Sequence, residues 1–188
     1  MLKKIGVDAV VSSSVPDIAG ADKLILPGVG GFDAGMDSIN RIGIISALND
    51  KVVARKTPIL GICLGMQLFT RASEEGHFQG LGWIDARTLK FRFDDSCGNI
   101  KVPHMGWNSV SPRKSSALLD GMGEDARFYF VHSYHVVCGD DRDVLTTTHY
   151  GQDFVSAFEK GNIIGTQFHP EKSHKFGMRL LKNFIDGF

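Results

Sequence analysis

Short apolar runs alternate with longer helical patterns in the first part of the chain. Residues 24–26 and 59–62 are brief apolar runs bounded by proline or glycine, which is typical of buried strands. Residues 8–11 read as a further short strand. Residues 37–55 show helical spacing, and residues 64–70 begin another helix. This order of strands and helices predicts a parallel sheet with helices on its faces. The apolar side of the first helix consists of Ile44, Ile45, Leu48, Val52 and Val53.

Further along, short apolar segments follow one another without a long helix between them. Strands are expected over residues 89–93, 128–137, 144–149, 154–158 and 163–168, with Gly151 and Gly161 in turns. A last amphipathic helix is expected over residues 175–186, with Phe176, Leu180, Leu181, Phe184 and Ile185 on its apolar side. The pattern predicts a single α/β domain over residues 1–188, with a mixed, largely parallel open sheet flanked by helices.

Composition and charge exclude several classes of protein. The 188 residues are 43% apolar, enough for one domain with a core. The chain has 21 basic and 21 acidic residues, so no basic excess indicates a nucleic-acid partner. No run approaches the roughly 20 apolar residues that a membrane span needs, and no signal peptide is evident. We therefore expect a cytoplasmic protein with neither nucleic-acid nor membrane partners.

Cysteine occurs at Cys63, Cys97 and Cys138. The number is odd and no two cysteines are closely spaced, which argues against a disulfide framework or a zinc site and for a reducing compartment. A zinc site through His132 and His135 is also rejected. If residues 128–137 form one strand, these two side chains point to opposite faces, and no further spacing completes a ligand set.

The strongest local motif is Gly61-Ile62-Cys63-Leu64-Gly65, which follows a buried strand and opens a helix. Glycines on both sides of a nucleophile at such a turn are typical of a nucleophile elbow, here with cysteine. They allow a sharp turn without a Cβ clash, and the helix N-terminus favours the thiolate. A buried structural cysteine between two closely packed glycines is the alternative interpretation.

A second candidate segment contains His169-Pro170-Glu171. Proline disfavours helical geometry at the residue before it, so His169 is expected to be extended. In an extended segment Glu171 faces the same way and reaches the ring nitrogen that His169 does not offer to Cys63. This predicts a nucleophile, base and carboxylate triad. A strand-end histidine with a solvated glutamate is the alternative.

A third element is the glycine-rich turn Pro27-Gly28-Val29-Gly30-Gly31, which follows a buried strand. It lacks the lysine and hydroxyl residue of a P-loop and the full spacing of a dinucleotide-binding turn. A better use is to present backbone N–H groups to an oxyanion.

Together these motifs resemble those of class I (triad) glutamine amidotransferases. More narrowly, three segments are similar to the glutaminase subunits of imidazole glycerol phosphate synthases, and the resemblance extends from about residue 5 to the C-terminus. These segments are Lys101-Val102-Pro103-His104-Met105-Gly106-Trp107-Asn108, Tyr129-Phe130-Val131-His132-Ser133-Tyr134 and His169-Pro170-Glu171-Lys172-Ser173.

The resemblance implies an activity and a set of site residues. Cys63, His169 and Glu171 would be catalytic and would release ammonia from glutamine through a thioester, with no metal or organic cofactor. The oxyanion would be held by N–H groups of Leu64 and the Val29–Gly30 turn. Substrate would be held by Gly28, Gly30, Gln67, Glu75, Ser133 and Tyr134. For Glu75 a solvated charge at a helix end is an equal alternative, and Met66 and Leu68 are expected in the core.

The resemblance also implies a partner, a (β/α)₈-barrel cyclase that receives the ammonia in histidine biosynthesis. Met105, Trp107, Tyr129 and Lys172 match positions at that subunit interface, although a core position is the alternative for Trp107. The ending Ser173-His174-Lys175-Phe176-Gly177 is similar to paralogues that supply ammonia to a surface-sugar amidotransferase. An inactive subunit is a third alternative.

One departure from the family lies at the start of the sequence. Family members usually open with a strand, a glycine-rich turn and most of a helix before the segment that matches residues 1–6. The domain is therefore expected to be N-terminally truncated relative to the family and to lack that strand. Its absence is expected to expose backbone hydrogen-bonding groups and apolar surface.

Overall fold

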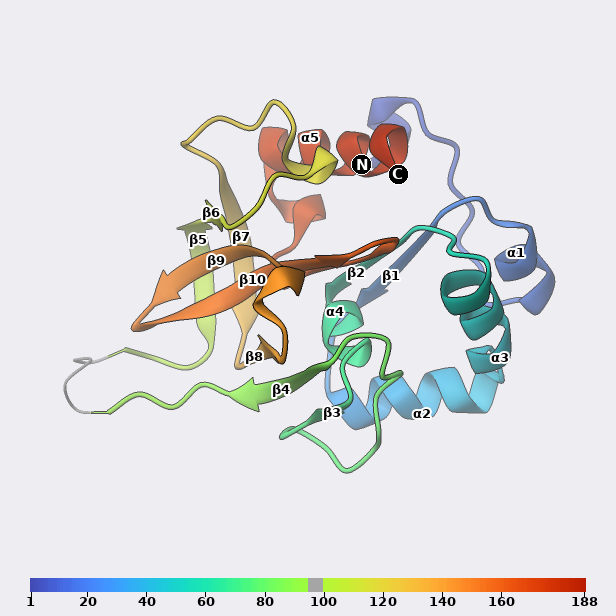
Figure 1. Cartoon of the computed structure of the whole chain (residues 1–188), viewed down its shortest axis with the longest axis horizontal. Coiled ribbons are helices and arrows are strands. Elements are labelled where there is room, and N and C mark those ends of the chain that lie inside the picture. Colours follow the sequence, from blue (N-terminus) through green and yellow to red (C-terminus); the bar gives the residue numbers. More distant parts are fainter. Residues whose placement is uncertain (95–99) are drawn as a thin grey trace.

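The computed structural model describes residues 1–94 and 100–188. Its first part alternates helices with two strands (Figure 1). The elements are η1 (Leu2–Ile5), α1 (Val15–Gly20), β1 (Leu24–Gly28), α2 (Phe32–Ile42), α3 (Ile45–Leu48), η2 (Asn49–Ala54), β2 (Ile59–Cys63) and α4 (Leu64–Leu68).

The second part consists mainly of strands and ends in a long helix. Its elements are β3 (Ala72–Ser73), β4 (Ala86–Lys90), β5 (His104–Ser109), β6 (Ser111–Pro112), η4 (Ala117–Leu119), β7 (Arg127–His132), β8 (Tyr134–Cys138), η5 (Asp141–Asp143), β9 (Val144–Tyr150), β10 (Gln152–Lys160), β11 (Ile163–Thr166), η6 (Pro170–Lys172) and α5 (His174–Gly187).

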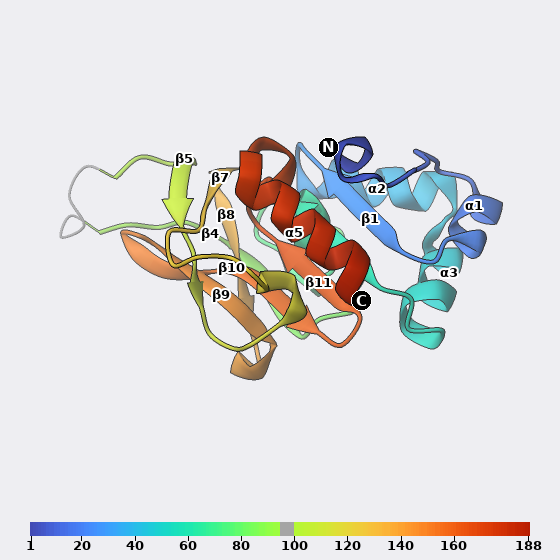
Figure 2. The ribbon, with the colours of Figure 1, turned by 90° about the horizontal axis from the view of Figure 1, so that it is seen from above.

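The main sheet is mixed, which confirms the α/β class. Its strand order is β1-β2-β11-β10-β8-β4-β3, with β9 paired to β10 and β6 to β9. Pairing is parallel between β1, β2 and β11 and between β3 and β4, and antiparallel elsewhere. Strands β5 and β7 form a separate antiparallel pair. Helix α5 lies on one face of the parallel part, and α4 and α2 lie on the other (Figures 1 and 2).

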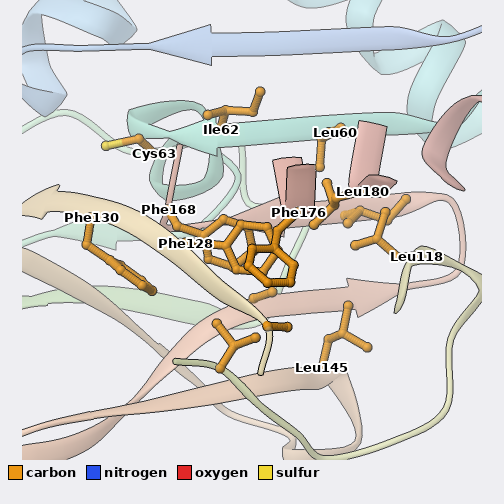
Figure 3. Packing of buried hydrophobic residues seen from close by; sticks show 14 of the residues in the cluster. Leu60, Ile62, Cys63, Leu118, Phe128, Phe130, Leu145, Phe168, Phe176 and Leu180 are labelled. Atoms are coloured by element: carbon orange, nitrogen blue, oxygen red, sulfur yellow. The ribbon is translucent and has the colours of Figure 1, made fainter. Parts of the chain in front are cut away.

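Strand β2 lies at the centre of the core, and all five of its residues are buried. Leu60 and Ile62 belong to the cluster that includes Phe128, Phe168 and residues of α5 (Figure 3). Ile59, on the opposite face, belongs to the cluster around Met66 and Phe69 of the α4 side. Burial on both faces explains why the run reads as continuously apolar rather than alternating.

Helix α5 covers the first of these clusters as predicted. Phe176, Leu180, Leu181 and Phe184 are buried in it, and Ile185 packs against it. The rings of Phe128 and Phe168 stack within the same cluster at 4.0 Å. Met66 and Leu68 are also buried, as expected for core residues of α4.

The predicted strand over residues 8–11 is wrong. These residues make no strand pairing, and the side chains of Val10 and Val11 are 81% and 102% exposed. A strand needs a neighbouring strand to pair its backbone groups. The sheet ends at β1, which pairs with β2, so residues 8–11 do not extend it.

The helical region after β1 also differs from the prediction. It begins at Phe32, five residues earlier than expected, and Gly43 divides it with a left-handed conformation (φ 77°). After this break Ile44, Leu48 and Val52 are buried, whereas Val53, in the π-helical turn η2, is 43% exposed.

The expected strand over residues 128–137 is divided at Ser133. Strand β7 pairs with β5, whereas β8 pairs with β4 and β10. Three other strands lie near their predicted positions but have different bounds, because β4 begins at Ala86, β10 extends over Gln152–Lys160 and β11 ends at Thr166.

The approach of α4 to β1 and β2 depends on two glycines. A Cβ atom at Gly65 would lie 1.9 Å from the carbonyl oxygen of Leu26, and one at Gly61 would lie 2.6 Å from the ring of Phe69. Neither glycine has a positive φ. Their function is therefore to leave space rather than to relieve backbone strain.

We predict that Gly65→Ala lowers the free energy of unfolding by at least about 1–3 kcal/mol, the usual cost of overpacking, because helix and strand must separate. Gly20→Ala is the matched control, since Gly20 also lies in a helix but has no atom near its missing Cβ. The control should be neutral or stabilising by up to about 1 kcal/mol. Equal stability of both variants in denaturant unfolding would contradict this account.

Candidate active site

Cys63 lies at the junction of β2 and α4 with φ 53° and ψ −108°. A non-glycine residue in this region is strained, and such strain is common at functional sites. The side chain is 8% exposed. Strand alternation would place Cys63 with Ile59, yet it belongs to the cluster that contains Leu60 and Ile62 (Figure 3). The turn therefore redirects the thiol at the carboxyl end of the strand.

The register of the parallel strands gathers the candidate segments. Gly28 of β1 pairs with Cys63, and Thr166 of β11 pairs with Ile62. The glycine-rich turn after β1 and the segment leading to His169 after β11 therefore leave the sheet beside Cys63. Sites in open α/β sheets characteristically lie at the carboxyl ends of the strands.

The His169 ring is oriented by Glu171. The backbone N–H of His169 donates to the carbonyl of Tyr129 at 2.9 Å, and the residue is extended as expected (φ −102°). Its Nδ1 lies 2.7 Å from Oε1 of Glu171. Glu171 lies in the η6 turn, so it reaches the ring through a helical turn and not through the strand alternation that the sequence suggested.

The environment of His169 raises its pKa to about 9. Burial by itself lowers the pKa, but interactions with Cys63 and Glu171 favour the charged ring and outweigh this effect. The pKa of Glu171 is lowered: burial raises it, but the bond to His169 prevails. Within the described residues, the buried Nε2 atom of His169 has no hydrogen-bond partner. This nitrogen is therefore available for proton transfer.

Acidic side chains hold the C-terminal end of the glycine-rich turn, where α2 begins. Glu75 accepts from the backbone N–H of Phe32, the first residue of α2, at 2.9 Å. Asp33 accepts from the N–H groups of His77 and Phe78 at 2.9 and 3.0 Å, which lowers its pKa. Glu75 thus caps a helix beside the turn.

Between these fixed points Val29 is 79% exposed and Gly30 has φ 101°. No neighbouring atom lies within 4 Å of the position that a Cβ at Gly30 would occupy. The backbone at these two residues is therefore open to a ligand. Leu64, the other candidate oxyanion residue, is the first residue of α4.

The candidate substrate residues Gln67 and Tyr134 are in contact. The side-chain amide of Gln67 donates to the carbonyl of Tyr134 at 3.3 Å and to Oε1 of Gln167 at 3.0 Å. Gln167 in turn donates to the sulfur of Cys63 at 3.7 Å. The sequence motifs indicated no role for Gln167, although the residue stands two positions before His169.

The carbonyl of Ser133 accepts from the N–H of Phe91 at 3.0 Å. The carbonyl of Tyr134 also accepts from Nδ1 of His132 at 2.7 Å. With Gln67 and His132 as donors, both lone pairs of the Tyr134 carbonyl are used.

Two buried histidines extend this network. Nε2 of His132 lies 3.0 Å from Nδ1 of His104, and Nε2 of His104 lies 3.3 Å from the amide of Asn108. Burial lowers the pKa of His132 to about 3 and that of His104 to about 4. Both rings are therefore neutral near pH 7.

The expected placement of His132 and His135 on opposite faces is wrong, because the bend at Ser133 turns both rings onto Phe91, at 5.3 and 4.7 Å. Residues 1–94 and 100–188 contain no group of three or more potential ligands that could hold a metal ion.

The four candidate interface residues lie side by side. Met105 and Trp107 are 61% and 44% exposed on β5. Trp107 pairs with Tyr129, and the ammonium of Lys172 lies 5.7 Å from the Tyr129 ring. We call Met105, Trp107, Tyr129 and Lys172 the interface patch. The ring of His174, which the sequence did not indicate, stacks on Trp107 at 5.5 Å.

Cys138, which the structure describes, differs from Cys63. Burial raises the pKa of Cys138 to about 12, so this thiol is unreactive near neutral pH. Cys97 lies outside the described residues. None of the helices in the described ranges is both long and apolar enough to cross a membrane.

A strained cysteine at the end of a parallel strand, with a histidine–glutamate pair after the neighbouring strand, is the arrangement typical of α/β enzymes that have a cysteine nucleophile. The family model "Glutamine amidotransferase class-I" matches residues 5–187. The chain belongs to this family, which confirms the resemblance found in the sequence.

Curated relatives are similar over nearly their full length. A protein of Methanococcus maripaludis named imidazole glycerol phosphate synthase subunit HisH 2 is 54% identical over 185 residues, 98% of this chain and 90% of the relative. A protein of the same name from Pseudomonas aeruginosa is 51% identical over 187 residues, 99% of this chain and 91% of the relative.

Solved structures have the same fold. A protein of Thermoplasma acidophilum, described as part of a GMP synthase, has a TM-score of 0.70 at 24% identity, covering 98% of this chain and 82% of that one. The glutaminase domain of Trypanosoma brucei CTPS has a TM-score of 0.58 at 17% identity, covering 98% and 83%. At these identities the likeness shows the fold alone.

The neutral buried histidines predict an acid-sensitive stability. Because the pKa values of His104 and His132 are lower in the folded state than the ordinary value of 6.5, the unfolded chain binds more protons below pH 6.5. Stability is therefore complete above pH 6.5 and is lost as the pH falls towards 4 and 3. At about pH 5 we expect a loss of roughly 2 kcal/mol for each histidine.

Denaturant unfolding at pH 6.5 and at about pH 5 measures this loss. His132→Asn, which retains a donor for the Tyr134 carbonyl, should show a smaller pH dependence over the same interval. An unchanged slope in this variant would contradict the assignment.

Proposed function

We propose that this chain is the glutaminase subunit of an imidazole glycerol phosphate synthase and hydrolyses glutamine to glutamate and ammonia. One observation is the basis of the proposal. The strained Cys63 ends β2, and the His169–Glu171 pair, joined at 2.7 Å, follows β11, the parallel neighbour of β2. The names of the relatives that are 54% and 51% identical support the assignment of the pathway.

In the proposed mechanism the sulfur of Cys63 attacks the side-chain amide carbon of glutamine, while His169 holds the thiol proton. The raised pKa of His169, about 9, keeps the ring protonated near neutral pH, so that a proton is ready for the departing ammonia. A glutamyl thioester remains. Water then attacks it, with His169 as the base, and glutamate and the thiol are released.

The negative oxygen that forms during both steps needs donors beside the sulfur. We assign this role to the N–H of Leu64, the first residue of α4, and to the turn at Val29 and Gly30. Leu64 directly follows Cys63, and Val29 directly follows Gly28. Because Gly28 and Cys63 pair across β1 and β2, both groups lie at the same edge of the sheet. The exposure of Val29 leaves this turn open to substrate.

We propose that Gly28, Gly30, Gln67, Glu75, Ser133 and Tyr134 surround the glutamine. The two hydrogens of the Gln67 amide are used by Tyr134 and Gln167, which leaves Oε1 of Gln67 for the substrate. Since both lone pairs of the Tyr134 carbonyl are used, this residue would contact glutamine through other atoms. Glu75 would act by holding the turn, because its carboxylate caps α2.

We propose that the partner is a (β/α)₈-barrel cyclase bound at the interface patch, in a cytoplasmic heterodimer whose joint reaction is that of a lyase. Large exposed aromatic and sulfur-containing side chains such as Trp107 and Met105 are enriched at protein interfaces. The patch adjoins the site directly, because the carbonyl of Tyr129 accepts from the backbone N–H of His169. Binding of the partner at this patch would therefore act on β7, whose Tyr129 carbonyl accepts the hydrogen bond from the backbone of His169.

We predict that Cys63→Ala abolishes both glutamine hydrolysis and labelling by glutamine analogues. Glu171→Gln should lower kcat by about 10²-fold, within the range of general acid–base catalysis, because His169 loses its orienting charge. Cys97→Ala and Cys138→Ala are the controls and should retain both activities. Steady-state kinetics and mass spectrometry measure these outcomes, and equal loss in a control variant would refute the assignment of the nucleophile.

We also predict that the isolated chain has low glutaminase activity, which rises when the cyclase binds together with its ligand. Coupling between two such sites typically gives a change of about 5- to 150-fold. Met105→Asp should reduce the stimulation, whereas Val15→Ser, at an exposed apolar residue of α1 outside the patch, should not. Full activity without a partner would count against this coupling. Capture of a sugar amidotransferase in place of the cyclase would identify the other acceptor.

A further inference from the structure

Gln167 is a buried polar residue beside the nucleophile. Its exposed fraction is 0%, and its Nε2 atom lies 3.7 Å from the sulfur of Cys63. Gln167 comes directly after β11 and, by strand alternation, faces the same side of the sheet as Ile163 and Gly165. These two residues pack against Phe158 and Met66 on the α4 side. The side chain of Gln167 therefore meets Gln67 of α4. Its neighbour Thr166 faces the opposite side of the sheet.

The orientation of the Gln167 amide is determined by its neighbours. The carbonyl of Tyr134 can only accept, so Gln67 must direct its amino group towards it. The same amino group donates to Gln167, which must present Oε1. The amino group of Gln167 is then the part that faces the Cys63 sulfur, as a donor.

The histidine pair fixes the same carbonyl from the other side. His132 donates to the Tyr134 carbonyl from Nδ1, so its Nε2 is the acceptor for Nδ1–H of His104. Nε2 of His104 then accepts from Asn108, whose amide also donates to the carbonyl of His149 at 2.9 Å. A continuous series of donors and acceptors thus extends from β5 to the sulfur.

We propose that Gln167 is a positioning residue for the nucleophile: its amide donates to the sulfur of Cys63 and stabilises the thiolate. A donor to an ionisable group favours its charged form. In the thiol form the S–H faces the carbonyl of Val131 at 4.0 Å, an acceptor that gives no support to a thiolate. Gln167 and His169 then supply two side-chain interactions that favour negative sulfur, in addition to the N-terminus of α4. The inference rests on the proposed function, in which Cys63 is the nucleophile.

The test compares Gln167→Met, which keeps the shape of the side chain but removes the amide, with Thr166→Val as the matched control. Thr166 is equally buried, and its hydroxyl donates to the carbonyl of Phe168 at 3.3 Å. The rate of alkylation of Cys63 by iodoacetamide is measured from acid to alkaline pH in the full chain, by mass spectrometry of the Cys63 peptide. Glutaminase kinetics are measured in parallel.

In Gln167→Met we expect the midpoint of the alkylation profile to rise by about one pH unit, as for the loss of one hydrogen bond to a charged group. The value of kcat should fall about tenfold at neutral pH. Thr166→Val should leave the midpoint unchanged. If Gln167→Met does not fold, Gln167→Asn, which draws the amide back by one methylene group, has the same expected result.

An unchanged midpoint in a folded Gln167 variant, with only its stability reduced, would overturn the inference and assign the residue a purely structural role. This outcome is distinct from failure of the proposed function. In that case Cys63→Ala would retain glutaminase activity whatever the Gln167 variants do.

Discussion

The close contact between α4 and the strands β1 and β2 is the constraint on which the rest of the site depends. Because a Cβ atom at Gly65 would overlap the carbonyl of Leu26, the helix can begin only where glycine permits it. The chain must then reverse within one residue, and that residue is Cys63, at φ 53°. Packing of the core thereby fixes the direction of the thiol and places the first turn of α4 beside it.

Local sequence was sufficient for the central part of this arrangement. Strand β2 and the start of α4 were predictable because the apolar run and the two glycines are adjacent in the chain. The segment around His169 was recognisable for the same reason. The start of α2 was not, because the cap on Phe32 comes from Glu75, which lies 43 residues further along the chain.

Changes of pairing partner explain the other differences. The segment of residues 128–137 is apolar over most of its length, but its first half pairs with β5 and its second half with β4 and β10, so it bends at Ser133. Gln167 could not be identified from its neighbours in sequence, since its significance comes from contacts with Gln67 and Cys63 about 100 residues away. Polar groups that are satisfied only by distant partners leave no periodic signal.

The anchoring of the glycine-rich turn at both ends has a consequence for how fast the turn can change conformation. Pairing of Gly28 with Cys63 fixes one end, and the bonds from backbone N–H groups to Glu75 and Asp33 fix the other. Only the backbone between these anchors can rearrange without disturbing a helix. Such small motions take place in nanoseconds to microseconds, whereas a typical enzyme turns over about ten times each second. The turn can therefore sample its arrangements many times within one catalytic cycle, so its motion would not limit the rate.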